Sequence, residues 1–543
     1  MNFLNRINNK FKRKLIEHNK ELFIKKKSNK KILLEFNAFH STHIAFSYLS
    51  NALSKKYDAQ ILPFFNYSII SAPLFPNMKD KIKWYLSKKF SLFNHGIYKS
   101  FGSSECFKPN IKKKNINASI KFLEAVFKKI KKKEQILSLR YKGILVGDIL
   151  YDTYLKSKNL PTIDLKSTSF MIHCENFISL CDFWIDYFSL NKIEAIITSH
   201  SVYSYAIPIR VAIKKKIKAF ACTSRHLYKL DKNEPRMHAN TKEYKKIYEK
   251  LNPELKSFGI KASKKILENR VKGKTDTASG FFGNVKISPF NKKKFDVKIN
   301  KNKKVKILIL PHDFYDAVHI YGNGLFPDLY EWLIFLGEFS KKNYQYDWYI
   351  KLRGDYRGKY KISHNRTANI IFDYLKKYPN LKILPNNFSL FQIKKQKIDF
   401  VLTVHGTAAL EFPLIDGPTV INASPNNPHA RYNFSITPKT IGQYKNILNN
   451  LKKLKDTKKK KINKNEIYQY YFMRHIYNDK NWLIDQNKLM NFLGIWQDQF
   501  TEKFYKYWLQ NFSMKRHNDI LKKIELYLNS NDRTMNIKFR KTI

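Results

Sequence analysis

The segment from Asp399 to Ala423, DFVLTVHGTAALEFPLIDGPTVINA, constrains the fold more than any other part of the chain. Its two continuously apolar runs, Asp399 to Val404 and Pro418 to Asn422, predict buried strands. A tight turn and a short helix lie between them, and Gly417 before Pro418 is a typical helix stop. Buried strands joined through a helix are typical of a parallel α/β sheet.

The turn between the first strand and the helix predicts a phosphate-binding site. Gly406 suits a backbone that passes close to another group, and Thr407 is placed to cap the helix, so that the amides of Gly406, Thr407 and Ala408 face the carboxyl end of the sheet. Pro413 falls inside the helix, where proline costs about 3 kcal/mol, and it predicts that the helix is short or kinked.

The rest of the chain repeats the strand–helix–strand pattern in two halves. We therefore predict an α/β fold of two Rossmann-like, doubly wound domains with a helical C-terminal extension. The predicted boundaries are 1–30 for a basic N-terminal segment, 31–228 for the first domain, 229–304 for a charged helical connector, 305–445 for the second domain and 446–543 for the helical C-terminal region.

Composition narrows the class and the compartment. The sequence has no run of about eighteen apolar residues, so we expect no transmembrane helix. The N-terminus lacks the apolar core of a signal peptide. Four scattered cysteines fit a reducing cytosol. The net charge of +59 is nearly all lysine spread along the chain, which fits AT-rich codon usage or an anionic membrane surface better than nucleic acid. The basic run from Lys10 to Lys31 is expected either to lie on a membrane as an amphipathic helix or to be a solvated, frayed terminus.

Four stretches resemble the capsule and surface-carbohydrate biosynthesis proteins, a family of GT-B-like bacterial glycosyltransferases. The strongest is His405 to Glu411. The others are the loop with Asp316 and His319, the strand end with Lys351 and Arg353, where the family has Lys-x-His-Pro, and the stretch Gly147, Asp148, Tyr151 and Asp152.

This resemblance implies transfer of a sugar from a nucleotide-activated donor to a glycan or lipid-linked acceptor, without a cofactor or metal. It implies a donor site made of Lys351, Arg353, His405, Gly406, Thr407, Ala408 and Glu411, in which Glu411 accepts the ribose hydroxyls and Lys351 and Arg353 supply charge from a neighbouring strand. The implied partners are the nucleotide sugar, the acceptor and the polysaccharide export machinery; the basic charge adds the anionic inner face of the cytoplasmic membrane as an expected partner.

The general base is expected from the first domain, at strand ends. The candidates are His40, with His43 beside it, Asp148 and His200; Asp316 and His319 form a second candidate set that would hold donor or acceptor. Three other functions stay open: a transferase of CDP-activated polyol phosphate, a non-catalytic polysaccharide-assembly protein on the same fold, and, from charge alone, a nucleic-acid binder.

Overall fold

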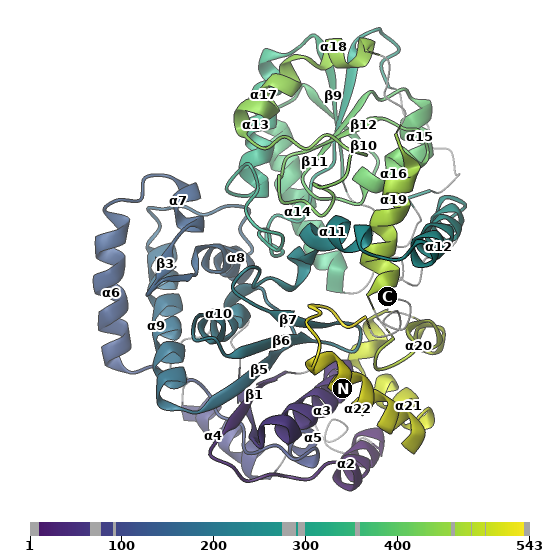
Figure 1. Ribbon diagram of the computed structural model, residues 1–543. Helices are drawn as coiled ribbons and strands as arrows, with labels where there is room; N and C mark the ends of the chain where they lie inside the picture. Colours follow the sequence, from purple (N-terminus) through teal and green to yellow (C-terminus); the bar gives the residue numbers. More distant parts are fainter. Residues whose placement is uncertain are drawn as a thin grey trace. The chain divides into compact units, whose positions relative to one another are not determined.

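A computed structural model describes residues 10–536 except 38, 66–77, 91–93, 274–288, 291–298, 353–358, 458–461, 479–480 and 495. The chain divides into two compact units. Unit 1 comprises Met1–Lys158, Ile163–Met237 and Asn478–Lys541, and unit 2 comprises Asn159–Thr162, His238–Tyr477 and Thr542–Ile543. Figure 1 shows the ribbon with its elements labelled.

The core of unit 1 is a five-stranded sheet in the order β2-β1-β5-β6-β7. All neighbours pair in parallel except β6 and β7, which are antiparallel. Helix α3 follows β1 and α10 follows β5, and they cover opposite faces of the sheet (Figure 1). The strands are β1 (Lys31–Phe36), β2 (Gln60–Phe65), β5 (Ile193–Thr198), β6 (Lys218–Cys222) and β7 (Leu227–Leu230), with a separate hairpin of β3 (Arg140–Tyr141) and β4 (Ile144–Leu145).

The helices of unit 1 come from three separate parts of the chain. They are α2 (Lys10–Leu22), α3 (His40–Tyr57), α4 (Met78–Lys89), α5 (Asn94–Ser100), α6 (Lys113–Phe127), α7 (Lys133–Leu137), α8 (Gly147–Lys158), α9 (Thr168–Leu190), η1 (Tyr203–Tyr205), α10 (Ala206–Lys214), α20 (Gln486–Leu493), η5 (Trp496–Phe500), α21 (Lys503–Gln510) and α22 (Met514–Leu528).

Both ends of the chain contribute to one hydrophobic core in unit 1. Leu15 and Phe23 from the N-terminal end and Trp482 and Trp508 from the C-terminal end are buried in the same cluster as side chains of β1 and α3. The chain from Trp482 onward therefore packs into the core of the first domain. The expectation of a solvated, frayed terminus is wrong for Lys10–Leu22, which is a helix that packs on unit 1. Membrane binding of the basic run stays a prediction, and the buried Leu15 and Phe23 are not available for it.

Unit 2 repeats the architecture with a five-stranded parallel sheet in the order β10-β9-β8-β11-β12. Its strands are β8 (Val305–Ile309), β9 (Tyr346–Lys351), β10 (Leu381–Leu384), β11 (Phe400–Thr403) and β12 (Thr419–Asn422). Its helices are η2 (Met237–Glu243), which begins at the boundary, α11 (Tyr244–Glu249), α12 (Pro253–Val271), α13 (Leu329–Lys342), α14 (Lys359–Lys377), α15 (Leu390–Lys395), α16 (Ala408–Leu414), α17 (Ile441–Asn449), α18 (Leu451–Asp456), α19 (Lys464–Tyr471) and the π-helical η4 (Phe472–Tyr477).

The predicted fold class, two doubly wound α/β domains, is confirmed. In both units the chain runs from the central strand to one edge, returns, and then runs to the other edge. The structure assigns the predicted connector and C-terminal region differently from the predicted boundaries: α11 and α12 lie in unit 2, which also holds the chain up to Tyr477. No helix in the described part of the chain is long and apolar enough to cross a bilayer.

The packing of α2 leads to a stability prediction. Leu15 is 1% exposed, so Leu15→Ala leaves a cavity in unit 1 and should lower its free energy of unfolding by about 2–5 kcal/mol. Ile24→Ala, at a side chain that is 84% exposed, is the control and should change it by less than about 0.5 kcal/mol. Urea unfolding, with hydrogen exchange in α3 and α21 to report on unit 1, measures both. Equal stability of the two variants would contradict the docking of α2.

Candidate functional site

The sheet order of unit 2 marks where a ligand is expected. From β8 the chain moves to β9 on one side, and from β11 it moves to β12 on the other, so the direction reverses between β8 and β11. Doubly wound sheets bind ligands outside the carboxyl ends of the strands at this switch point. The loops that begin after Ile309 and Thr403 therefore form the candidate site.

Two histidines from these loops stack at the switch point. The rings of His312 and His405 lie 4.5 Å apart at 21°, and the His405 amide donates to His312 Nε2 at 3.4 Å. Thr403 Oγ1 lies 3.0 Å from the same nitrogen. Gly406 leaves room for this arrangement, because a Cβ on it would lie 3.2 Å from His312 Cε1, a tight contact. The glycine thus allows the close approach that the sequence predicted, and the approaching group is His312.

A half-buried arginine completes this edge of unit 2. Arg474 Nη2 donates to the Tyr321 hydroxyl at 3.1 Å, Nη1 donates to the Tyr470 hydroxyl, and the Tyr321 ring lies 5.4 Å from that of His405. Among the described residues no carboxylate pairs with Arg474. Two neutral phenols leave a guanidinium with unused donors, which is suited to a phosphate oxygen. Arg474 lies in the π-helical η4, a type of helix that is frequent at functional sites.

A third histidine behind this edge is held neutral. His429 is buried, with its ring 4.8 Å from that of Tyr470. Burial, then the charges of Arg474 and His405, lowers the pKa of His429 to about 3. At neutral pH His429 is therefore uncharged and adds no positive charge beside Arg474.

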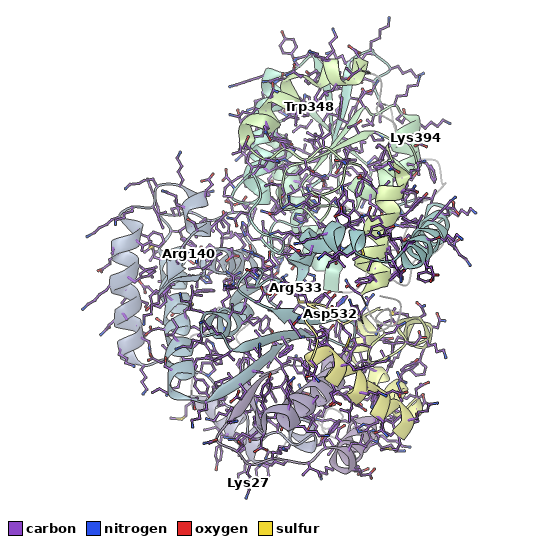
Figure 2. All side chains as sticks on the ribbon, in the orientation of Figure 1. Lys27, Arg140, Trp348, Lys394, Asp532 and Arg533 are labelled. Carbon is purple, nitrogen blue, oxygen red and sulfur yellow. The ribbon has the colours of Figure 1, made fainter. Side chains whose placement is uncertain are left out.

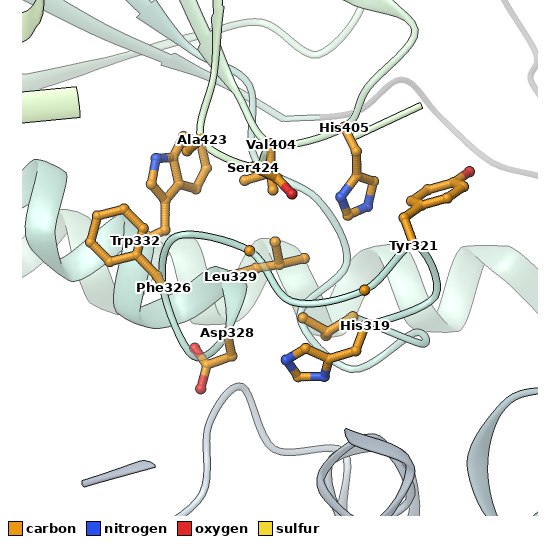
Figure 3. A pocket seen from close by; sticks show the side chains of 13 residues that line it. His319, Tyr321, Phe326, Asp328, Leu329, Trp332, Val404, His405, Ala423 and Ser424 are labelled. Carbon is orange, nitrogen blue, oxygen red and sulfur yellow. The ribbon is translucent and has the colours of Figure 1, made fainter. Parts of the chain in front are cut away.

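A small pocket opens beside the paired rings (Figure 3). Figure 3 shows His405 and Tyr321 side by side, with His319 below them. The pocket has a volume of about 20 Å³, enough for about one water molecule. His319 lines it but is buried, with Nε2 2.9 Å from the Pro327 carbonyl oxygen, whereas Asp316 is exposed.

The helix after the turn differs from its prediction in two respects. Thr407 occupies the cap position, but its side chain makes no cap hydrogen bond, and α16 has seven residues with Pro413 inside it. The predicted short helix is confirmed, and the predicted capping hydroxyl is wrong. So short a helix adds little dipole, because the dipole sums over aligned peptide units. The amides of Gly406 and Ala408 at its start thus have weak support as an anion cradle.

Glu411 takes part in a buried ion pair. Arg270 of α12 donates to its Oε1, and the two side chains are 7% and 5% exposed. The carboxylate expected to accept ribose hydroxyls therefore already neutralises a cation from the predicted connector. Glu411 is accounted for by this pairing, and we leave it out of the proposed donor contacts.

Lys351 ends β9 at the carboxyl edge of the same sheet. Its amine donates to the Leu352 carbonyl at 3.3 Å. Burial lowers the pKa of Lys351 to about 8, against the charge of Glu411, which raises it. The expectation that its strand neighbours β11 is wrong, because β8 lies between them. Arg353 lies outside the described residues.

The histidines of unit 1 lie at the corresponding switch point, between β1 and β5. His40 opens α3 after β1, and His200 follows β5, with the ring of Phe39 6.2 Å from that of His200. Burial, then the charge of Lys12, lowers the pKa of His40 to about 4, although a bond to the Phe500 backbone opposes this. His43 is fully enclosed, with Nδ1 2.6 Å from the Tyr505 hydroxyl.

Asp148 is the centre of a buried ion network in unit 1. Arg210 donates to both of its oxygens, with Nη2 at 2.8 Å, and Arg236 Nη2 donates at 2.7 Å. Burial alone would raise the pKa of Asp148, but the two guanidiniums hold it well below the usual range. A carboxylate stabilised in this way is a poor proton acceptor. The structure thus brings His40 and His200 to one switch point and keeps Asp148 in a structural pair.

Sequence reasoning missed His312, Tyr321 and Arg474. His312 carried a usable signal, because it follows an apolar strand by a few residues, as His40 and His200 do. Arg474 carried none, since it lies in a lysine-rich helical region far along the chain from the strand ends. Within the described residues no group of three or more His, Cys, Asp or Glu side chains is arranged to hold a metal ion.

Comparisons with known proteins found similarity only at the level of structure. No protein-family model matches the chain, and no curated protein matches it. The KpsC β-Kdo 2,4 transferase of Thermosulfurimonas dismutans is similar at 13% identity over 51% of this chain and 79% of that chain, with a TM-score of 0.30.

Two further structures cover more of the chain. The UDP-GlcNAc 2-epimerase of Methanocaldococcus jannaschii, solved with UDP-GlcNAc and UDP, is 13% identical. The match covers 81% of this chain and 97% of the epimerase, with a TM-score of 0.25. A glycosyltransferase of Rickettsia africae ESF-5 is 10% identical over 90% of this chain and 100% of the glycosyltransferase, with a TM-score of 0.24. Similarities this low do not assign a function to this chain.

The Asp148 network predicts a pH-dependent stability. Asp148→Asn leaves the buried Arg210 without a carboxylate and Arg236 with Glu234 alone, so it should destabilise unit 1 by about 3–5 kcal/mol at pH 7. Because the folded pKa is depressed, the carboxylate stabilises above its unfolded pKa of about 3.9, and this stability is lost as pH falls below it. The difference between wild type and variant should therefore shrink in acid.

The control for this prediction is Asp186→Asn. Asp186 pairs with Lys114 at the surface, where the side chains are 36% and 66% exposed, and its loss should cost less than about 1 kcal/mol. Urea unfolding at several pH values measures both variants. A difference at Asp148 that stays constant down to pH 3 would contradict the role of its charge.

Proposed function

We propose that the chain is a glycosyltransferase that binds a nucleotide-activated sugar at the switch point of unit 2. The observation that carries the proposal is Arg474, a half-buried cation with phenol partners and no described carboxylate, beside the His312–His405 stack. Burying an unpaired charge is costly, and an anionic ligand at this position would compensate it. The diphosphate of a nucleotide sugar is such a ligand, and the edge of a doubly wound sheet is where it is expected.

The leaving nucleotide diphosphate gains negative charge as the sugar–phosphate bond breaks. In the proposed reaction Arg474 and Lys351 stabilise that charge, with the amides of Gly406, Thr407 and Ala408 and His405 as further donors. These fixed donors would take the place of a metal ion, so we propose metal-independent transfer without a cofactor.

The acceptor hydroxyl must lose a proton as its oxygen bonds to the anomeric carbon. We propose His40 or His200 of unit 1 as the base, because both follow the central strands of that sheet. The low pKa of His40 keeps it neutral at pH 7, as a base must be, although it also makes His40 a weak base. Asp316 and His319 remain candidates for holding donor or acceptor.

The biological setting of the proposal rests on sequence resemblance. On that basis the acceptor is a glycan or lipid-linked sugar of bacterial surface or capsular polysaccharide, made in the cytoplasm and passed to export machinery. A CDP-activated polyol-phosphate transferase would use the same diphosphate site, and a non-catalytic assembly protein would bind a glycan without a donor. The choice of ligand and the presence of turnover distinguish these functions.

The donor site is tested by nucleotide binding. UDP-, GDP-, CMP- and CDP-activated donors should be screened by thermal shift in excess EDTA, since a ligand of the folded state raises its apparent stability. At least one donor should bind and be turned over. Arg474→Met should weaken the binding of that donor by about 1.5–3 kcal/mol, because it removes hydrogen bonds to a charged group.

Arg431→Met is the matched control, because Arg431 is an exposed arginine of the same unit. It should leave donor affinity unchanged. Equal affinity of the Arg474 variant and wild type in calorimetry would move the site elsewhere. Transfer that is lost in EDTA and restored by Mg²⁺ would reject the metal-independent mechanism, and binding of a CDP-polyol alone would select the alternative transferase.

The lowered pKa of Lys351 predicts how donor binding depends on pH. Above about pH 8 the free protein loses the ammonium charge of Lys351, so the dissociation constant of a nucleotide sugar should rise by up to about tenfold per pH unit. Lys351→Arg keeps the charge and should make affinity nearly constant between pH 7 and 9.5. A wild-type affinity that is constant over this range would exclude Lys351 from the site.

A further inference from the structure

Helix α4 of unit 1 has an exposed apolar stripe. Met78, Ile82, Tyr85 and Leu86 are 71%, 52%, 60% and 42% exposed, and Phe90, directly after the helix, is 61% exposed. Their spacing of three, four and eight residues places them along one side of the helix. Single exposed apolar side chains are ordinary, but several on one helix face mark an interaction surface.

Ile24, which is 84% exposed, belongs to the same part of the surface. Its backbone packs against Gly102, where an added Cβ would lie 2.9 Å from the Ile24 carbonyl oxygen. Glu105, three residues later, pairs with Lys88 of α4 at 2.8 Å. The bond from Lys88 lowers the pKa of Glu105, and Lys99 and Lys25 add to this effect. The end of α4 and the segment after α2 therefore gather around one carboxylate.

Lysines border this apolar surface. Lys25 and Lys27 are exposed in the segment after α2, and Figure 2 shows Lys27 at the edge of unit 1. Lys89 Nζ lies 6.0 Å from the Tyr85 ring centre and 5.7 Å from that of Phe90. Aromatic rings with lysine amines beside them suit the boundary between acyl chains and headgroups, where the ring enters and the amine stays in water.

We propose that this surface, which we call the α4 face (Ile24, Met78, Ile82, Tyr85, Leu86 and Phe90 with their neighbouring lysines), docks unit 1 on an anionic lipid bilayer. The charge favours lipid over the other possible occupants. In a pair of identical chains these lysines would face the same lysines of the other copy, and two chains of net charge +59 would repel each other. Nucleic acid would pair with the lysines but would leave the aliphatic side chains in water. An anionic bilayer satisfies both parts of the face.

The test compares vesicle binding of the full chain and its variants. Wild type should co-sediment with vesicles of phosphatidylglycerol and phosphatidylcholine, and salt should weaken the binding. Ile82→Asp with Leu86→Asp should weaken it by at least about tenfold, because two apolar side chains no longer enter the bilayer. Phe372→Asp, at a 48% exposed side chain of α14 in unit 2, is the matched control and should bind as wild type does.

Other readouts keep the outcome clear. Unfolding midpoints and soluble nucleotide binding should be unchanged in all variants, so failure of this proposal is distinct from failure of the donor site. If the double aspartate variant does not fold, Met78→Gln with Tyr85→Gln replaces it. Vesicle binding equal to wild type in the folded variant would overturn the proposal. The proposal would also be overturned if the variant lost self-association but kept lipid binding. It would equally be overturned if the wild type bound double-stranded DNA more tightly than vesicles at equal salt.

Discussion

The parallel pairing of β8 with β11 determines the arrangement of the candidate site. It aligns Ile307 to Ile309 with Phe400 to Leu402, and the two loops that follow must then leave the sheet side by side. His312 and His405, 93 residues apart, stack because of that register. A Cβ on residue 406 would lie 3.2 Å from His312 Cε1, so glycine also eases the close approach that the strands set up. The candidate site is a consequence of how the sheet is assembled.

A comparable constraint acts at the ends of the chain in unit 1. The sheet face covered by α3 is completed by α2 and by the segment from Trp482 onward, which share its core. Neither terminal region is an appendage, since removing either would expose that core to water. Leu15 of α2 is buried in this core and Phe11, Ile16 and Leu22 pack against it, whereas the apolar side chains of the α4 face remain exposed. The surface available for lipid is therefore set by which helices the core has already used.

Much of this was predictable, because continuous apolar runs specify buried parallel strands and the order of strands and helices specifies a doubly wound sheet. The switch points then follow, and with them the neighbourhoods of His40, His200 and His405. Long-range partners did not follow. Glu411 on a helix looks the same in sequence whether it meets a ribose or Arg270, and apolar spacing in α2 is the same for a protein core as for a bilayer. Arg474 reaches the site only through tertiary packing.

The buried arginines differ in whether a carboxylate of the fold pairs with them. Arg210 and Arg236 share Asp148, and Arg270 holds Glu411, so each of these charges is compensated within the fold. The remaining described arginines of unit 2 are Arg366 and Arg431, which are exposed and solvated, and Arg474. Among the four described arginines of unit 2, which include Arg270, only Arg474 combines partial burial with neutral partners. This leaves an electrostatic cost that the described residues do not offset. The excess of lysine across the chain says little about chemistry, because most of those charges are in water. A single guanidinium without an acid, at the place where the sheet topology expects a ligand, says considerably more.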